Sequence, residues 1–169
     1  KDYSSNISKA TCNRAISWLY FSGIIGFCAK ITEMDILDFK SASRCYFMDM
    51  GLANYYLTRT GTDSRVLAGT LNENYVYINL KKRQDFPQEI SFETPAFATY
   101  RGGEIDFVAQ SLSSSTRYLI EVKAGKGTAS TAQKALAQGK ADKLLYLKGA
   151  TKGGIDLSLI HISEPTRPL

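Results

Sequence analysis

Two short stretches of this chain, GGEIDFV at residues 102–108 and IEVKAGK at residues 120–126, place charged residues inside otherwise apolar runs. Runs rich in β-branched and aromatic residues predict buried strands. A buried carboxylate is costly unless an ion pair, a hydrogen bond or a metal ion compensates it. The fold must therefore supply partners for carboxylates in this part of the core. The charged residues concerned are Glu104, Asp106, Glu121 and Lys123.

The remaining sequence predicts an α/β fold in which these strands join a mixed sheet flanked by helices. Thr11 is expected to cap the first helix. The predicted helices are residues 9–26, 51–57, 64–82 and about 128–138. The predicted strands are residues 27–31, 44–48, 95–101, 104–110, 118–123 and 143–148.

Three segments are expected along the chain. Residues 1–60 predict a winged-helix-like segment, because a helix is followed by two strands and the aromatic residues there are typical of a core. The polar run around Gly61 predicts a boundary, and residues 61–156 form the α/β domain. Residues 157–169, LSLIHISEPTRPL, resemble the translation of a sequencing adapter at the end of a truncated metagenomic reading frame.

The adapter-like tail holds the single histidine of the chain, His161. Without it the chain cannot form Ser–His or Cys–His nucleophile pairs, and zinc chemistry is not expected. The three cysteines are widely spaced, and no apolar run is long enough to cross a bilayer. These features predict a cytoplasmic protein without a membrane partner. The first residue, Lys1, indicates a fragment that lacks its N-terminal part.

Glu73 adds a fourth carboxylate to the set. It lies on the predicted helix 64–82, where residues spaced by three or four share one largely apolar face. The members of that face are Val66, Thr70, Glu73, Tyr77 and Leu80. A carboxylate in such a position needs a lysine, backbone donors or a metal ion as a partner.

The spacing of Asp106, then Glu121-x-Lys123 on the next strand, is that of PD-(D/E)XK nucleases. Mg²⁺ or Mn²⁺ accepts hard oxygen ligands, so we expect Asp106, Glu121 and Glu73 as the metal ligands. Lys123, on the same face as Glu121, would orient the attacking water or stabilise the transition state. Because side chains alternate along a strand, Glu104 should share a face with Asp106, but it ranks behind the other acids. The alternative is a set of ordinary cross-strand ion pairs on a solvent face.

Five segments together resemble the C-terminal domain of unknown function that follows an AAA+ ATPase module in bacterial and archaeal predicted ATP-binding proteins. They are RCYFMDMGLANYYL (44–57), LNENYVYINL (71–80), GGEIDFV (102–108), IEVKAGK (120–126) and KALAQGKADKLLYLKG (134–149). The resemblance implies a PD-(D/E)XK nuclease-like fold behind the winged-helix-like segment, and it places the four site positions on Glu73, Asp106, Glu121 and Lys123. It also implies a missing N-terminal ATPase module as a partner. The fragment itself has no Gly-rich phosphate loop, so no ATP site is expected here.

Three functions stay open from the sequence. The first is a Mg²⁺-dependent nuclease acting on DNA, which the intact carboxylate and lysine set favours. Eight basic against two acidic residues between Arg117 and Lys152 would suit a nucleic-acid partner, although charge alone favours a solvated lysine face. The second is a non-catalytic nuclease-like module that binds nucleic acid or a protein. The third is a protein-interaction module that uses the aromatic N-terminal segment, which an exposed apolar patch near residues 18–27 would favour.

Overall fold

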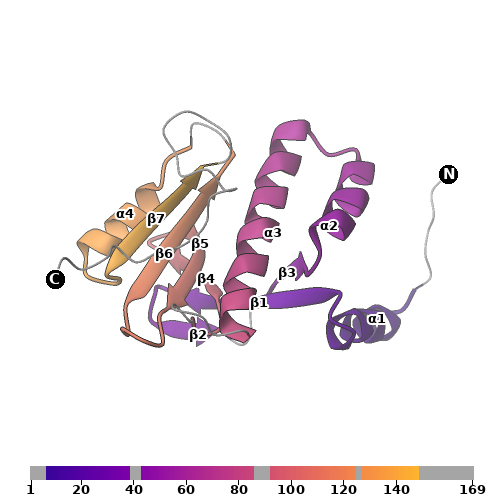
Figure 1. Cartoon of the computed structure of the whole chain (residues 1–169), viewed down its shortest axis with the longest axis horizontal. Coiled ribbons are helices and arrows are strands. Elements are labelled where there is room, and N and C mark those ends of the chain that lie inside the picture. The colour runs from indigo at the N-terminus through magenta and orange to yellow at the C-terminus, as the bar shows by residue number, and fades with distance from the viewer. Residues whose placement is uncertain (1–6, 39–42, 86–91, 125–126, 149–169) are drawn as a thin grey trace.

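A computed structural model describes residues 7–38, 43–85, 92–124 and 127–148 (Figure 1). The adapter-like tail predicted at residues 157–169 lies outside these residues. The helices are α1 (Lys9–Phe21), α2 (Met50–Leu57), the 3-10 turn η1 (Thr58–Thr60), α3 (Ser64–Asp85) and α4 (Ser130–Ala137). The strands are β1 (Ile25–Thr32), β2 (Ile36–Asp38), β3 (Arg44–Phe47), β4 (Ala96–Tyr100), β5 (Gly103–Gln110), β6 (Arg117–Lys123) and β7 (Lys143–Lys148).

The strands form one seven-stranded mixed sheet in the order β2-β1-β4-β5-β6-β7, with β3 paired to β1. The pairs β1–β4 and β6–β7 are parallel, while β4–β5 and β5–β6 are antiparallel. The predicted α/β fold with a mixed sheet and flanking helices is therefore confirmed. Its nuclease-like and winged-helix-like character remain predictions.

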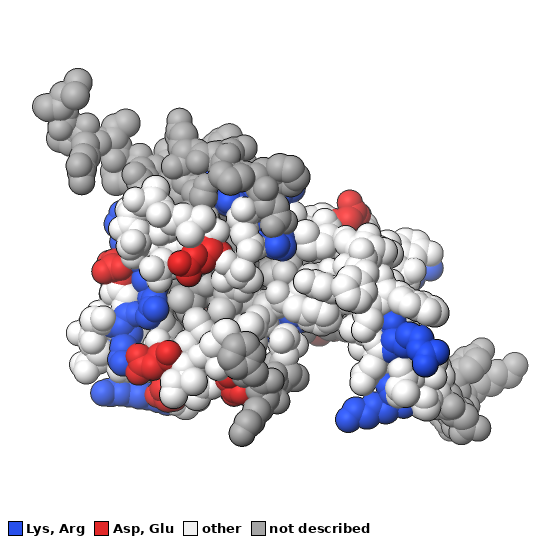
Figure 2. All heavy atoms as spheres, turned by 90° about the horizontal axis from the view of Figure 1, so that it is seen from below, with Lys and Arg blue, Asp and Glu red and all other residues white. Residues whose placement is uncertain are grey.

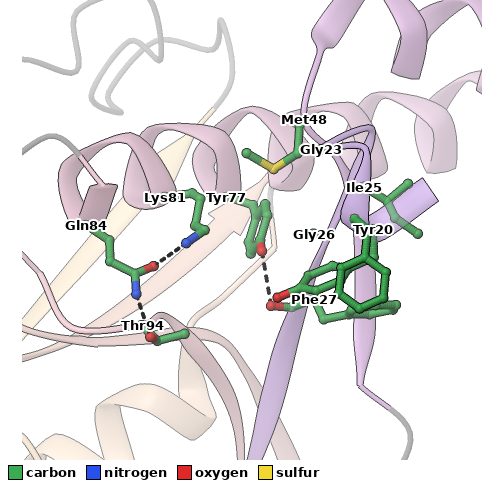
Figure 3. Close-up of a pocket in the computed structure, with 11 residues that line it drawn as sticks. Tyr20, Gly23, Ile25, Gly26, Phe27, Met48, Tyr77, Lys81, Gln84 and Thr94 are labelled. Atoms are coloured by element: carbon green, nitrogen blue, oxygen red, sulfur yellow. Dashed lines mark hydrogen bonds between the residues drawn. The ribbon is translucent and has the colours of Figure 1, made fainter. Parts of the chain in front are cut away.

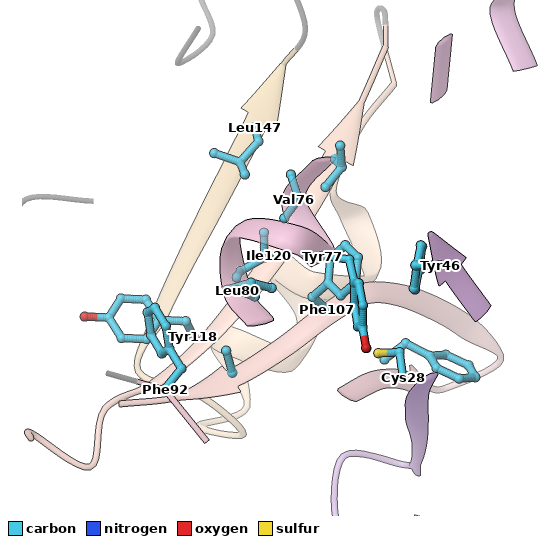
Figure 4. Close-up of a cluster of buried hydrophobic side chains, with 13 residues drawn as sticks. Cys28, Tyr46, Val76, Tyr77, Leu80, Phe92, Phe107, Tyr118, Ile120 and Leu147 are labelled. Atoms are coloured by element: carbon cyan, nitrogen blue, oxygen red, sulfur yellow. The ribbon is translucent and has the colours of Figure 1, made fainter. Parts of the chain in front are cut away.

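Two hydrophobic clusters cover the two faces of the sheet. The cluster in Figure 4 packs Val76, Tyr77 and Leu80 of α3 against side chains of β1, β3, β4, β5, β6 and β7. The other packs Ala132 and Ala135 of α4 against the opposite face, and Figure 1 shows α3 and α4 on opposite sides of the sheet. Small alanines let α4 lie close to the strands, because a helix with no bulky side chains can approach a sheet closely.

Strand β1 links the N-terminal part of the chain to the main sheet. Its first half, Ile25 to Cys28, pairs with β3, and its second half pairs with β2 and β4. Strands from both sides of the predicted boundary near Gly61 thus share one sheet, and the boundary itself stays a prediction. This connection brings Arg44 of β3 close to Glu73 and Glu104.

Strand β5 contains an irregularity at its acidic part. Ala96 pairs with Val108, whereas Ala98 pairs with Ile105, so two residues of β5, Asp106 and Phe107, lie opposite one residue of β4. Such a β-bulge breaks the alternation of side chains. Ile105 accordingly packs in the α4 cluster and Phe107 in the α3 cluster, although they are two residues apart. The expectation that Glu104 and Asp106 share a face assumed an alternation that β5 does not have.

Three local expectations need correction. The N-cap of α1 is Ser8, whose hydroxyl accepts from the Thr11 N–H, rather than Thr11 itself. The strand β2 was not predicted, because its three residues are too short for a periodic signal. Only the second half of α3 packs on the sheet, since Val66 is 59% exposed, so Glu73 lies where the exposed half meets the buried half.

The aromatic residues of α1 are also not core residues. Trp18 is 68% exposed and Phe21 is 82% exposed, and α1 has no buried residue. In Figure 1 this helix lies at the end of β1, at the opposite end of the molecule from α4, and its Tyr20 contacts Phe27 of β1. The prediction from composition was wrong here because burial depends on a packing partner and not on the residue type alone.

Candidate functional site

The site begins where β5 and β6 separate. Their pairing ends at Phe107 and Ile120, although β5 starts at Gly103 and β6 continues to Lys123. Beyond this point the Val122 N–H donates to Asp106 Oδ2 at 2.8 Å. The carboxylate thus takes the place of a backbone acceptor on β5. The bulge in β5 therefore places a buried carboxylate directly in the gap between two strands.

Lys123 joins the two buried carboxylates at this gap. Its Nζ lies 2.7 Å from Glu121 Oε2 and 3.1 Å from Asp106 Oδ2. The Glu121 side chain is 3% exposed and the Asp106 side chain 10% exposed, whereas Lys123 reaches solvent with 27%. Glu121 and Lys123 were expected on one face of a strand, and the structure brings them together with Asp106 as a set of ion pairs.

Glu73 belongs to a second group beside the first. Its Oε2 accepts from the Tyr46 hydroxyl at 3.4 Å and from Arg44 Nη1 at 3.5 Å. Arg44 Nη2 also lies 2.6 Å from Glu104 Oε1. Glu104 therefore pairs with Arg44 and not with the lysine that holds Asp106 and Glu121.

The pKa shifts show that the two groups interact. Burial raises the pKa of Glu73, and the nearby negative charge of Asp106 raises it further, while Arg44 and Lys123 oppose the rise. Burial also raises the pKa of Glu121, against the hydrogen bond from Lys123. For Lys123, burial works to lower the pKa, but Glu121 and Asp106 outweigh it and raise the pKa.

The cluster carries more negative than positive groups. Among the described residues, the ion pairs of this carboxylate cluster join Glu73, Glu104, Asp106 and Glu121 to two basic side chains, Arg44 and Lys123. One carboxylate oxygen, Glu121 Oε1, is buried without any hydrogen-bond partner among the described residues. An orphaned buried oxygen normally has an ion or a water molecule as its partner. An ion or a water molecule can thus bind at Glu121 Oε1.

The donor chemistry fits a hard divalent cation, because all the acids offer carboxylate oxygens. Within the described ranges, however, no three or more His, Cys, Asp or Glu side chains are arranged to hold a metal ion as they stand. Lys123 contacts both buried carboxylates, so a cation that binds Glu121 and Asp106 must displace the ammonium from at least one of them. The assignment of Asp106, Glu121 and Glu73 as ligands stays a prediction.

The sequence interpretation missed Arg44 and Tyr46. Both lie on β3, where residues two apart point to the same face, and that alternation was the available signal. The Arg44 guanidinium lies 4.6 Å from the centre of the Phe97 ring, and Tyr46 stacks on Tyr77 with the ring centres 4.6 Å apart. These contacts fix both donors next to Glu73.

A separate cavity of about 520 Å³ lies away from the carboxylate cluster, between the end of α1, β1 and α3 (Figure 3). Aromatic side chains line one side of it. On the other side, Lys81 donates to Gln84, and Gln84 donates to Thr94. None of the predicted site residues lines this cavity.

In the face drawn in Figure 2, basic and acidic groups lie side by side at the left end, basic groups gather at the lower right, and the surface between them is mostly uncharged. This view offers no continuous basic path.

The exposed aromatic residues of α1 are the feature that favours the hypothesis of a protein-interaction module. No described helix combines the length and the apolar character required for a bilayer span.

Comparison with known proteins gives one family. The family model Domain of unknown function (DUF4143) matches residues 68–156, which is more than half of the chain. The match includes all four predicted site residues and excludes β3. Searches of curated proteins and of solved structures found no match.

Proposed function

Because the chain belongs to the family described as Domain of unknown function (DUF4143), whose description assigns no activity, we propose from the site itself that it cleaves DNA phosphodiester bonds with Mg²⁺ or Mn²⁺. One observation carries the proposal. The buried Glu121 Oε1 has no partner among the described residues, and it belongs to the carboxylate that shares Lys123 with Asp106. A buried carboxylate oxygen normally has a partner, and a divalent cation would supply one at this position.

In this proposal Asp106, Glu121 and Glu73 hold the cation through their carboxylate oxygens. When bound, the cation neutralises charge on the phosphate and makes a water molecule more acidic. The ammonium of Lys123, released from the carboxylates, would donate a hydrogen bond to the attacking water or to a phosphate oxygen. The gap between β5 and β6 fixes Asp106 through the Val122 N–H, so this carboxylate is positioned by the sheet itself.

The test is cleavage of supercoiled plasmid and of single-stranded DNA by the chain, with Mg²⁺, Mn²⁺ or EDTA. We expect metal-dependent cutting that falls at least about 100-fold in Asp106→Asn and in Lys123→Met, because each removes a group with a direct role. Asp35→Asn is the matched control, since Asp35 is an exposed carboxylate that pairs with Lys140. Equal cutting by all variants would refute the roles assigned to Asp106 and Lys123. Cutting that persists in EDTA would refute the need for a metal ion.

A specific observation favours a second candidate, a non-catalytic module that binds a protein partner or nucleic acid. Lys123 already compensates both buried carboxylates, and α1 exposes Trp18 and Phe21. The same experiment separates the two functions. The non-catalytic module would show no cutting with either metal, while retaining any DNA binding measured by fluorescence anisotropy in EDTA.

A further inference from the structure

We propose that Arg44 is a positioning residue of this site, which holds Glu73 in place and makes β3 part of the metal-binding machinery. The inference rests on the proposed function and adds a residue outside the matched range 68–156. Arg44 starts β3, which pairs with the first half of β1. The site would then depend on the N-terminal part of the chain.

The contacts of Arg44 fix the guanidinium from three directions. Glu104 of β5 holds Nη2 at 2.6 Å, and the ring of Phe97 on β4 lies 4.6 Å from the guanidinium carbon. The Tyr46 hydroxyl, two residues along β3, lies 3.5 Å from Nη1. A planar guanidinium held in this way presents its donors in one orientation, which a lysine cannot reproduce.

The constrained guanidinium contacts Glu73 through Nη1, at 3.5 Å from Oε2. The Tyr46 hydroxyl meets the same oxygen at 3.4 Å. Glu73 lies on α3 next to the exposed half of the helix, where its own element gives the side chain little support. Two donors from β3 therefore set the direction of the Glu73 carboxylate, which lies close enough to Asp106 and Lys123 for their charges to shift its pKa.

If Arg44 acts only through its charge, its removal should change cation binding in one direction, and if it positions Glu73, in the opposite direction. Arg44 is a positive charge near the carboxylates, so its removal would strengthen the binding of a divalent cation if charge were its only contribution. If Arg44 positions Glu73, its removal weakens binding, because groups that orient metal ligands typically contribute 10- to 100-fold to affinity. The sign of the change decides between the two roles.

The experiment is isothermal titration of MnCl₂ into the parent chain, Arg44→Gln, Arg44→Lys and Arg59→Gln. We expect about a 10-fold loss of Mn²⁺ affinity in Arg44→Gln. Arg44→Lys keeps the charge and should still lose most of the affinity, and it replaces Arg44→Gln in the comparison if the latter does not fold. Arg59→Gln is the matched control, because Arg59 is exposed and lies over the ring of Tyr55. Unchanged or tighter binding by both Arg44 variants would overturn the proposal.

A double-mutant cycle provides a readout without metal. The free energies of unfolding of Arg44→Gln, Glu73→Gln and the double variant are measured in EDTA by urea denaturation. Coupled side chains give a non-additive cycle, and an additive cycle refutes the positioning role. If the parent binds no Mn²⁺ while the cycle is non-additive, the proposed nuclease function fails and the Arg44–Glu73 interaction stands.

Discussion

Replacing Lys123 with methionine tests the carboxylate cluster most directly. Methionine has nearly the length of lysine but no charge, so the change removes the ammonium and little of the packing. The variant leaves Glu121 and Asp106 without the Nζ that lies 2.7 Å and 3.1 Å from them. We expect two opposite effects, a loss of stability in EDTA and a gain in affinity for Mn²⁺.

The size of the first effect follows from burial. Removing one partner of a buried ion pair costs roughly 3–5 kcal/mol of stability. We expect the lower end, about 3 kcal/mol, because Lys123 is partly exposed and the Val122 N–H still donates to Asp106. A chain of this length loses roughly 2–4 °C of Tm for each kcal/mol, so Tm should fall by about 6–12 °C. The deficit should shrink below the raised pKa of Glu121, because burial favours its protonated form there.

The second effect follows from competition. In the parent, a cation that binds the two carboxylates must displace an ammonium, and in Lys123→Met it does not. We expect at least about a 10-fold gain in Mn²⁺ affinity, equivalent to about 1.4 kcal/mol. Mn²⁺ at about 100 times its Kd then restores about 2.7 kcal/mol of stability, which nearly offsets the loss. DNA cleavage should nevertheless stay absent, because the lysine is gone.

The assays are thermal unfolding by circular dichroism and calorimetric titration of MnCl₂, with Lys134→Met as the control. Lys134 is an exposed lysine on α4, so its replacement should change neither quantity. If Lys123→Met unfolds at the same temperature as Lys134→Met, the ammonium does not compensate the buried acids. If it binds Mn²⁺ more weakly than the parent, the cation does not bind at these carboxylates.

Two further predictions concern pH and packing. The raised pKa of Glu73 means that the native state binds a proton there more tightly than the unfolded chain does. The resulting stabilisation is complete below about pH 4.3 and is lost as pH rises through the folded-state pKa. The free energy of unfolding, measured by urea denaturation from pH 4 to 8, should therefore vary less with pH in Glu73→Gln than in the parent, and parallel pH profiles would contradict the shift. Gly26→Ala should destabilise the chain by about 1–3 kcal/mol, because the added Cβ would meet the hydroxyl of Tyr77. Gly69→Ala, where a Cβ meets nothing within 4 Å on the same helix as Tyr77, should be neutral or stabilising, and equal effects of the two changes would refute the packing argument.

The regular elements were predictable because their signals are local. The spacing of apolar residues predicted a helix from residue 64 to 82, and α3 runs from Ser64 to Asp85. The apolar runs around Asp106 and Glu121 predicted β5 and β6, which are observed as neighbours in the sheet. The sequence thus placed Asp106, Glu121 and Lys123 on neighbouring strands, but it predicted the two acids around a cation and not in ion pairs with Lys123.

The rest of the site depends on contacts between distant parts of the chain. The bulge at Asp106 is a shift in the register of β5 on β4, and it depends on how two separate strands pair and not on the sequence of β5 alone. Arg44 reaches Glu73 only because β3 pairs with β1 and β1 pairs with β4. No periodicity within residues 44–48 could show which acids that arginine meets.

The hydrogen bond from the Val122 N–H to Asp106 determines which substitution at Asp106 is informative. Asp106 Oδ2 accepts from the Val122 N–H, which has lost its backbone partner where β5 and β6 part. An alanine at this position would leave a buried N–H unpaired, at a cost of roughly 1–3 kcal/mol, and would confuse loss of fold with loss of chemistry. Asparagine has the same shape and keeps one oxygen acceptor for the Val122 N–H, while an NH₂ group replaces the other oxygen and the charge is removed. Asp106→Asn that folds like the parent but neither cuts DNA nor binds Mn²⁺ would therefore assign the charge, and not the backbone contact, to the function.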